Sequence, residues 1–267
     1  MKKFSLFVLC ALLCLMNGCG SKEDKNISDL SGKEKLIIGM DCENQPFAFG
    51  TATQNEDSVV LGDAYCKGFD VSLARYITSN LQREIEIVNI DQNKMTEALA
   101  EGSIDVAISA LTWSDSEDID VSSPYYEEEH AIVVLKDSKL AKAKAISEFA
   151  KAKMMGVAQS ASNLAIDEIK DVQHLEAATD IKALQEALSN KTCDALVVSL
   201  SQAKAIIKNN KDFVMLTFKD AFKTKNQYVI AMEDGLKDEE ESLYHEIEKV
   251  LSKLEEQTKT DWMKKFQ

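Results

Sequence analysis

The order of predicted elements indicates an α/β fold in which helices cover a sheet. An apolar run over 35–41, KLIIGMD, is typical of a buried strand, and GFDVSLARYITSNL over 68–81 repeats apolar residues at fourfold steps, as a helix does. REIEIVNI over 83–90 alternates polar and apolar residues and predicts a second strand. An apolar face over 241–257 predicts one long helix near the end of the chain. Alternating strands and helices are the pattern of a sheet covered by helices.

Two helix–turn–strand units predict two similar lobes that share one cleft. In the first unit, a helix from Met95 ends at Gly102, and IDVAISAL over 104–111 is typical of a buried strand. Leu99, Asp105 and Leu111 are six residues apart, and so are Leu188, Asp194 and Leu200. Ligands of open α/β sheets bind at the carboxyl ends of strands, so each unit brings one strand end to the cleft. Because the unit is common, an accidental match is the alternative.

The first residues have the pattern of a bacterial secretion signal. Lys2 and Lys3 precede a short apolar core, which predicts a signal peptide over 1–18. LMNGC resembles the lipobox of bacterial lipoproteins, although Met16 and Asn17 are atypical, and the resemblance implies a lipid on Cys19. Residues 19–34 then form a polar tether. The chain is therefore expected to be extracytoplasmic and anchored to the bacterial membrane through the lipid; a plain secreted protein is the alternative.

Composition narrows the class of partner. The formal charge is −14 and the pI is near 4.8, which argues against nucleic acid because its binding needs a basic surface. After the signal and Cys19, three cysteines remain. Cys193 precedes a buried strand, where a small apolar residue is expected. Cys42 and Cys66 flank a polar insertion, so a disulfide or two free thiols are both open.

Four motifs carry a resemblance to a known family. LIIGMDCENQPFAF, GFDVSLARYI, MTEALAEGSIDVAISALT and IDVSSPYY occur in the order and spacing of the periplasmic-binding proteins of amino-acid ABC importers, the bacterial family 3 solute-binding lipoproteins. The similarity continues to TDWMKKF at the end of the chain. It implies a two-lobe, type II (Venus-flytrap) fold with two hinge crossings. Residues 35–128 and 229–267 are expected in lobe 1 and residues 129–228 in lobe 2. The implied partners are a small solute and ABC permease subunits, and the expected state is a monomer.

The sequence departs from this family at the ligand anchors. Where family members have an Arg for the ligand carboxylate, this chain has Asp115 or a neighbour, and no Lys or Arg lies between Lys94 and Lys136. Ser199 stands where the family has an Asp for the ligand ammonium group. A buried carboxylate without a cationic partner is costly. A cationic or neutral polar solute, such as an amine or amino-acid derivative, is therefore expected; a Lys or Arg from elsewhere, for example Lys67, Lys204 or Lys225, is the alternative.

Polar side chains and rings at the predicted cleft are the candidate ligand-binding residues. They are Asp41, Asn44, Phe47, Gln92, Thr112, Trp113, Asp115, Ser160, Ser162 and Ser199. For Asp115 the alternative is a solvated acidic loop, and for Trp113 it is packing beneath that loop. Backbone N–H groups near Ser160 could also hold a ligand oxygen.

Enzyme chemistry has little support in the sequence. His130, His174 and His245 lie in separate segments without metal-ligand spacing, and nucleophile elbows, phosphate loops and dinucleotide fingerprints are missing from the sequence. No cofactor and no metal are expected. Two alternatives remain open. One is a ligand-sensing lipoprotein without transport. The other is a dehydratase of the kind found rarely in this family, with Asp41 and Asp115 as acid and base.

Overall fold

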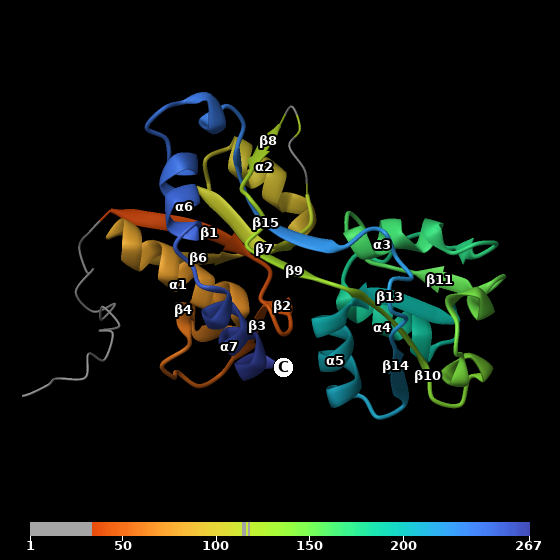
Figure 1. Ribbon diagram of the computed structural model, residues 1–267. Coiled ribbons are helices and arrows are strands. Elements are labelled where there is room, and N and C mark those ends of the chain that lie inside the picture. The colour runs from red at the N-terminus through yellow and green to blue at the C-terminus, as the bar shows by residue number, and fades with distance from the viewer. Residues whose placement is uncertain (1–33, 114–115, 117) are drawn as a thin grey trace, which may run out of the picture.

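The protein folds into two lobes connected by two crossings (Figure 1). The computed structural model describes residues 34–113, 116 and 118–267. The predicted signal over 1–18, the lipidation site Cys19 and the candidate Asp115 lie outside the described residues. No helix in the described part of the chain is long and apolar enough to cross a membrane.

Lobe 1 contains a mixed sheet in the order β6-β1-β7-β15-β8. β1 pairs in parallel with β6 and β7, whereas β15 runs antiparallel to β7 and β8. The strands are β1 (Lys35–Met40), β6 (Glu84–Asn89), β7 (Val106–Leu111), β8 (Ile119–Val121) and β15 (Asn226–Glu233). The parallel order of β6, β1 and β7 places their carboxyl ends at one edge of the sheet, where the cavity lies.

Helices cover both faces of this sheet because its strands are apolar on both sides. On one face, Leu36, Ile38 and Met40 of β1 pack in a core that is covered by α1 (Phe69–Leu81), α6 (Leu243–Leu251) and α7 (Glu256–Phe266). On the other face, Ala107 and Leu111 of β7 pack in a second core that is covered by α2 (Met95–Ala100). The helix predicted over 241–257 is two helices. The chain turns after Leu251, and Leu254 then packs into the core.

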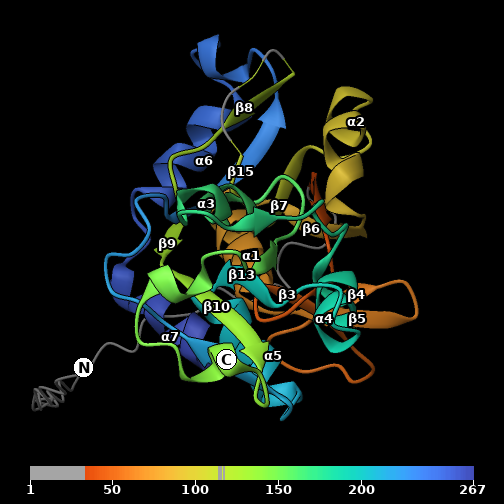
Figure 2. The same ribbon diagram turned by 90° about the vertical axis from the view of Figure 1, so that its right-hand side faces the viewer.

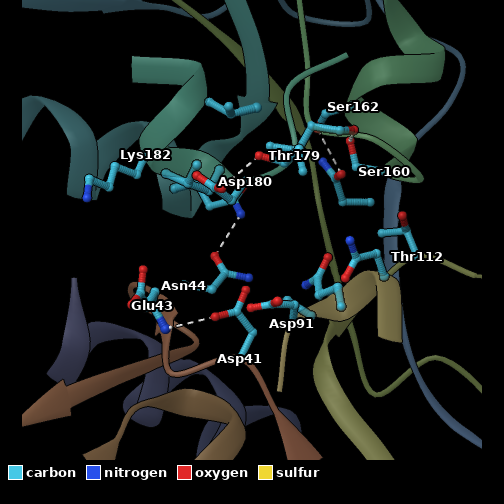
Figure 3. A pocket seen from close by; sticks show the side chains of 18 of the residues that line it. Asp41, Glu43, Asn44, Asp91, Thr112, Ser160, Ser162, Thr179, Asp180 and Lys182 are labelled. Carbon is cyan, nitrogen blue, oxygen red and sulfur yellow. Dashed lines mark hydrogen bonds between the residues drawn. The ribbon is translucent and has the colours of Figure 1, made fainter. Parts of the chain in front are cut away.

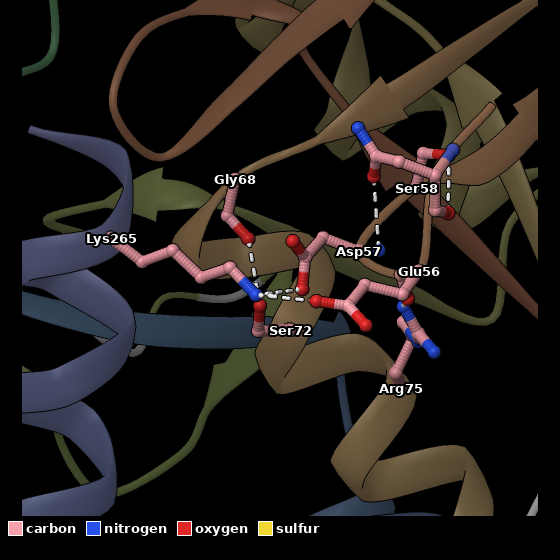
Figure 4. Close-up of polar contacts among 8 residues, drawn as sticks. Glu56, Asp57, Ser58, Gly68, Ser72, Arg75 and Lys265 are labelled. Carbon is pink, nitrogen blue, oxygen red and sulfur yellow. Dashed lines mark hydrogen bonds and ion pairs between the residues drawn. The ribbon is translucent and has the colours of Figure 1, made fainter. Parts of the chain in front are cut away.

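The segment predicted as a polar insertion forms a small antiparallel sheet. Its strands are β2 (Glu43–Asn44), β3 (Ala48–Thr51), β4 (Val59–Leu61) and β5 (Ala64–Lys67), in the order β2-β3-β5-β4. A disulfide joins Cys42 to Cys66. Lys265 of α7 forms an ion pair with the loop between β3 and β4, since its Nζ lies 2.6 Å from a carboxylate oxygen of Asp57 in that loop (Figure 4). The ion pair and hydrogen bond to Asp57 raise the pKa of Lys265.

Lobe 2 contains a five-stranded sheet in the order β12-β11-β13-β10-β14. The strands are β10 (His130–Leu135), β11 (Lys153–Met155), β12 (Gln173–His174), β13 (Ala195–Ser199) and β14 (Phe213–Leu216). The α-helices are α3 (Ala161–Ala165), α4 (Ile181–Ser189) and α5 (Leu200–Asn209), and 3₁₀ turns join the remaining segments. Two buried clusters lie on opposite faces of the sheet, as they do in lobe 1.

The repeated helix–turn–strand unit has the same hydrogen bonds in both lobes. The carboxylate of Asp105 accepts from the N–H of Ile37 at 2.7 Å, and that of Asp194 accepts from the N–H of Lys153 at 2.8 Å. In each case the Asp fastens the start of its strand to the neighbouring parallel strand. The matching six-residue steps in the sequence therefore reflect one local structure that occurs twice. Gly102, with φ +65°, ends the helix of the first unit as predicted.

The lobes are joined where β9 (Tyr126–Glu128) leads into β10, and where the chain returns along β15. β9 pairs with the first three residues of β15, so the two crossings are hydrogen-bonded to each other (Figure 2). The buried carboxylate of Glu128 accepts from the hydroxyl of Tyr228 at 2.8 Å and from the N–H of Ser201 at 2.9 Å. Burial raises the pKa of this carboxyl, and the hydrogen bonds partly offset that effect. Glu128 therefore ties both crossings to the start of α5.

Candidate functional site

A cavity of about 370 Å³ lies between the two lobes (Figure 3). Lobe 1 lines it with the segments that follow β1, β6 and β7, and lobe 2 with the starts of α3, α4 and α5. The lobe 1 lining consists of Asp41, Glu43, Asn44, Asn89, Asp91, Gln92, Asn93, Ala110 and Thr112. The lobe 2 lining consists of Val157, Ser160, Ser162, Thr179, Asp180, Ile181, Lys182, Val197, Val198 and Gln202. Asn226 and Tyr228 line it from the hinge.

Acidic side chains dominate the charge of the cavity. Asp41, Glu43 and Asp91 line it from lobe 1 and Asp180 from lobe 2. Burial raises the pKa of Asp41, and the neighbouring carboxylates of Glu43, Asp91 and Asp180 raise it further. This cluster of like charges makes the cavity favourable for a cation.

Lys182 is the one basic side chain among the described residues that line the cavity. It is exposed, and Figure 3 shows it at the edge of the group of labelled residues. Burial raises the pKa of Asp180, but hydrogen bonds from the N–H of Ala183 and from Thr179 outweigh this effect and lower it overall. Asp180 therefore stays charged while it caps α4.

Three buried polar side chains, Ser162, Asn226 and His130, are linked by hydrogen bonds beside the cavity. Ser162 donates to the amide oxygen of Asn226 at 3.0 Å, and Nδ1 of His130 lies 2.9 Å from the amide nitrogen of Asn226 and 3.0 Å from the hydroxyl of Ser162. Because the amide nitrogen is a donor, Nδ1 accepts and the proton of the neutral ring is on Nε2. Burial lowers the pKa of His130, which keeps the ring neutral. The set fixes Ser162 and Asn226 at the cavity wall.

Within the part of the chain that the structure describes, two hydrogen bonds connect the lobes at the cavity. The side-chain nitrogen of Gln202 donates to the oxygen of Asn44 at 2.9 Å, and the N–H of Ala161 donates to the hydroxyl of Thr112 at 2.8 Å. The described arrangement is therefore one in which the lobes are in contact around the cavity.

A family model for the bacterial extracellular solute-binding proteins, family 3, matches residues 36–266. The chain belongs to this family. The match spans both lobes and both crossings, and the resemblance noted in the sequence is confirmed. Members of this family are solute-binding proteins, and the relatives described below include amino-acid-binding extracellular proteins of ABC transporters.

Three relatives are similar over most of the chain. The arginine-binding extracellular protein ArtP of Bacillus subtilis is 27% identical, over 99% of this chain and 97% of its own length. A probable histidine-binding protein of Campylobacter jejuni is 27% identical, over 80% of each chain. The ABC transporter glutamine-binding protein GlnH of B. subtilis is 24% identical, over 92% of this chain and 86% of its own length.

A solved structure confirms the fold. The amino acid ABC transporter substrate-binding protein AbpA of Streptococcus pneumoniae, bound to L-arginine, superposes with a TM-score of 0.70 and 23% identity, over 89% of this chain and 96% of that one. The α/β, two-lobe type II binding-protein fold is thereby shown for this family member.

Six of the candidate residues lie at the cavity of this solute-binding protein. They are Asp41, Asn44, Gln92, Thr112, Ser160 and Ser162. Ser160 also caps α3 by accepting from the N–H of Asn163 at 3.1 Å. The structure therefore brings together residues that follow four different strands in the sequence.

Three other candidates do not line the cavity. Phe47 is fully buried in the core of lobe 1, because the turn between β2 and β3 directs its ring against Tyr228, with the ring centroids 4.7 Å apart. Trp113 packs against the apolar cluster beneath β7. Ser199 is buried and caps α5 by accepting from the N–H of Gln202 at 3.3 Å. Its hydroxyl thus serves the helix rather than the cavity.

Several cavity residues were not among the sequence candidates. The polar run Asp91, Gln92 and Asn93 follows a strand, and that position could have identified Asp91 and Asn93 as well as Gln92. Thr179 and Asp180 precede α4 and Lys182 is its second residue, and these positions carry no comparable signal, because helix starts are commonly polar. The three lysines considered as cations from elsewhere do not line the cavity: Lys67 lies over the ring of Phe49, Lys204 contacts Gln267 and Lys225 contacts Glu127.

Proposed function

We propose that this family 3 member is the solute-binding lipoprotein of an ABC importer, and that it captures a cationic or neutral polar solute between its lobes. The lipid on Cys19 would hold it at the extracytoplasmic face of the membrane, and permease subunits would receive the solute. The observation that carries the choice of ligand is the set of carboxylates at the cavity, Asp41, Glu43, Asp91 and Asp180, against one exposed lysine among the described residues that line it.

The charge of the cavity distinguishes ligand classes. Near Asp41, a ligand carboxylate would add to repulsion that already raises the pKa of this residue. A ligand ammonium or guanidinium group would offset that repulsion, and a guanidinium group can donate two parallel hydrogen bonds to one carboxylate. The amides of Asn44 and Gln92 add neutral hydrogen-bond partners. Amines and guanidines therefore fit the cavity better than acidic solutes.

Names of the relatives support a cationic ligand in part. ArtP is an arginine-binding protein and the C. jejuni relative a probable histidine-binding protein, whereas GlnH is a glutamine-binding protein. Arginine brings a carboxylate as well as a guanidinium group, and Lys182 is the cavity cation that could receive it. Agmatine has the same guanidinium group on the same carbon chain but lacks the carboxylate. Comparing the two therefore measures what the carboxylate contributes.

The proposal is tested by calorimetry with the purified protein against agmatine, arginine, lysine, glutamine and glutamate. We expect agmatine to bind at least as tightly as arginine and glutamate to bind weakly. Asp41→Asn should weaken agmatine binding about tenfold or more, since a hydrogen bond to a charged group is lost. Asp63→Asn makes the same charge change at an exposed turn away from the cavity and should leave the affinity within about twofold.

Two outcomes would contradict the proposal. Micromolar binding of glutamate would show that the cavity accepts an acidic solute, and equal losses in Asp41→Asn and Asp63→Asn would show that only overall charge matters.

Asp115→Asn belongs in the same series, because the sequence places Asp115 where the family has its carboxylate-binding Arg. We expect it to weaken the best cationic ligand as well.

A further inference from the structure

β7 has an irregularity next to the cavity. Against β15, Ala107 pairs with Ala231 and Leu111 pairs with Val229, so four steps along β7 match two steps along β15. Two extra residues of β7 are thus accommodated as a bulge between these pairs. Ala110 lies in the bulge with φ +48°, a left-handed conformation that alanine rarely adopts, and it lines the cavity. Such a conformation persists only where the surroundings hold it.

The carboxylate of Asp70 holds the bulge from beneath. Asp70 is at the start of α1 and fully buried, and its Oδ2 accepts from the N–H of Ala110 at 2.7 Å. Its Oδ1 accepts from the buried hydroxyl of Tyr125 at 2.8 Å. Neither donor is a cation. The N–H of Tyr125 donates to the carbonyl of Tyr228 at 2.8 Å, so the pair also reaches the hinge.

The bulge in turn holds two other segments of the cavity wall. The hydroxyl of Ser109 accepts from the N–H of Asp41 at 3.1 Å, and the carbonyl of Ser109 accepts from the side-chain nitrogen of Gln92 at 2.7 Å. Ser109 itself is fully buried. The segments after β1, β6 and β7 therefore meet at the bulge. Asp41 and Gln92, which line the cavity, are both oriented by it.

We propose that Asp70 is a positioning residue for ligand binding, because its carboxylate fixes the β7 bulge that orients Asp41, Gln92 and Ala110 at the cavity. The proposal rests on the proposed binding function. Asp70 does not touch the ligand and acts through the backbone of Ala110. Its loss should therefore alter the affinity even in protein that remains folded.

The test compares two substitutions of Asp70 with a structural control. Asp70→Ala removes both acceptors and leaves the N–H of Ala110 without its partner. Asp70→Asn keeps a carbonyl oxygen for Ala110, and its amide can donate to the oxygen of Tyr125. Leu73→Ala removes a buried apolar side chain of the same helix, three residues after Asp70, which destabilises the fold without removing a hydrogen bond to the bulge.

Binding of agmatine is measured at a temperature at which all variants are folded by circular dichroism. We expect Asp70→Ala to weaken binding about tenfold or more, and Asp70→Asn and Leu73→Ala to stay within about threefold. Unchanged affinity in folded Asp70→Ala would overturn the proposal. An equal loss in Leu73→Ala would also overturn it, because the effect would then follow from stability alone.

Amide hydrogen exchange in the ligand-free protein provides a second measurement that does not depend on the ligand. Asp70→Ala should speed exchange at Ala110 and Asp41, while the N–H of Ala183 in lobe 2 should exchange as in the parent. If agmatine does not bind the parent protein, the proposed ligand class fails, and exchange still decides the role of Asp70. Unchanged exchange at Ala110 and Asp41 would refute that role.

Discussion

Asn44 of lobe 1 and Gln202 of lobe 2 are hydrogen-bonded across the cavity, with 2.9 Å between the amide nitrogen of Gln202 and the oxygen of Asn44. The side-chain oxygen of Gln202 accepts from the N–H of Ser199 at 3.3 Å, as part of the capping box of α5. The amide thus joins the start of a lobe 2 helix to the segment after β1. Because this bond exists only when the lobes meet, it favours the closed arrangement, and we expect ligand binding to be linked to that closure.

Removing this bridge should weaken binding through closure. Asn44→Ala should cost about 0.5–1.5 kcal/mol, or about two- to tenfold in affinity, and should leave more open protein at partial saturation. X-ray scattering with and without agmatine measures the change in radius, and calorimetry measures the affinity. Asn80→Ala, an exposed amide that bonds within α1, is the matched control. Additive losses in Asn44→Ala and Gln202→Ala would show that the two side chains do not act as a pair.

The buried carboxyl of Asp70 should make stability depend on pH. Burial raises the pKa of Asp70 to about 7, although the hydrogen bonds from Tyr125 and Ala110 lower it. A group whose pKa is higher in the folded state stabilises the fold below its unfolded pKa, and this stability is lost as pH rises through the folded value. The contribution of Asp70 should therefore decline between about pH 4 and pH 7, by at most about 4 kcal/mol.

Urea denaturation of the parent and of Asp70→Asn at pH 4.5, 6.0 and 7.5 isolates this contribution from other groups. Asp70→Asn cannot ionise, so its advantage in unfolding free energy over the parent should grow as pH rises. A difference that stays constant across this range would contradict the raised pKa.

Loss of the disulfide should lower both stability and affinity. Cys42 and Cys66 are 24 residues apart, and a crosslink of that span is worth roughly 3 kcal/mol in the chain-entropy model. Cys42 directly follows Asp41, so the crosslink also restrains the segment that lines the cavity. Reductant should lower the melting temperature of the parent. The double variant Cys42→Ser/Cys66→Ser should melt at the lower temperature and show no response to reductant; a response there would point to another cause.

Cys19 should determine membrane attachment. In cells, Cys19→Ala should leave an uncleaved precursor or a soluble protein, and partitioning into the detergent phase of a Triton X-114 extract should be lost. Cys193→Ala removes a buried thiol of lobe 2 and should partition as the parent does. Equal partitioning of Cys19→Ala and the parent would refute the lipid anchor.

Much of the fold could be predicted from the sequence because its determinants are local. Periodicity over a dozen residues identified the strand 35–40, the helix 69–81 and the strand 106–111, and the six-residue steps identified a unit that occurs in each lobe. Candidates that directly follow strands, such as Asp41, Gln92 and Thr112, do lie at the cavity, since parallel strands bring their carboxyl ends to one edge.

Tertiary structure alone decided the rest of the site. Phe47 and Ser199 occupy positions near strand ends, but a turn places one in the core and a helix cap engages the other. Asp180, Lys182 and Gln202 reach the cavity because lobe 2 faces lobe 1, and that approach depends on contacts between residues more than a hundred positions apart. Sequence periodicity records which face of an element is buried. Long-range hydrogen bonds and packing set the position of one lobe against the other and the side chains that meet there. These contacts do not produce a periodic pattern in the sequence.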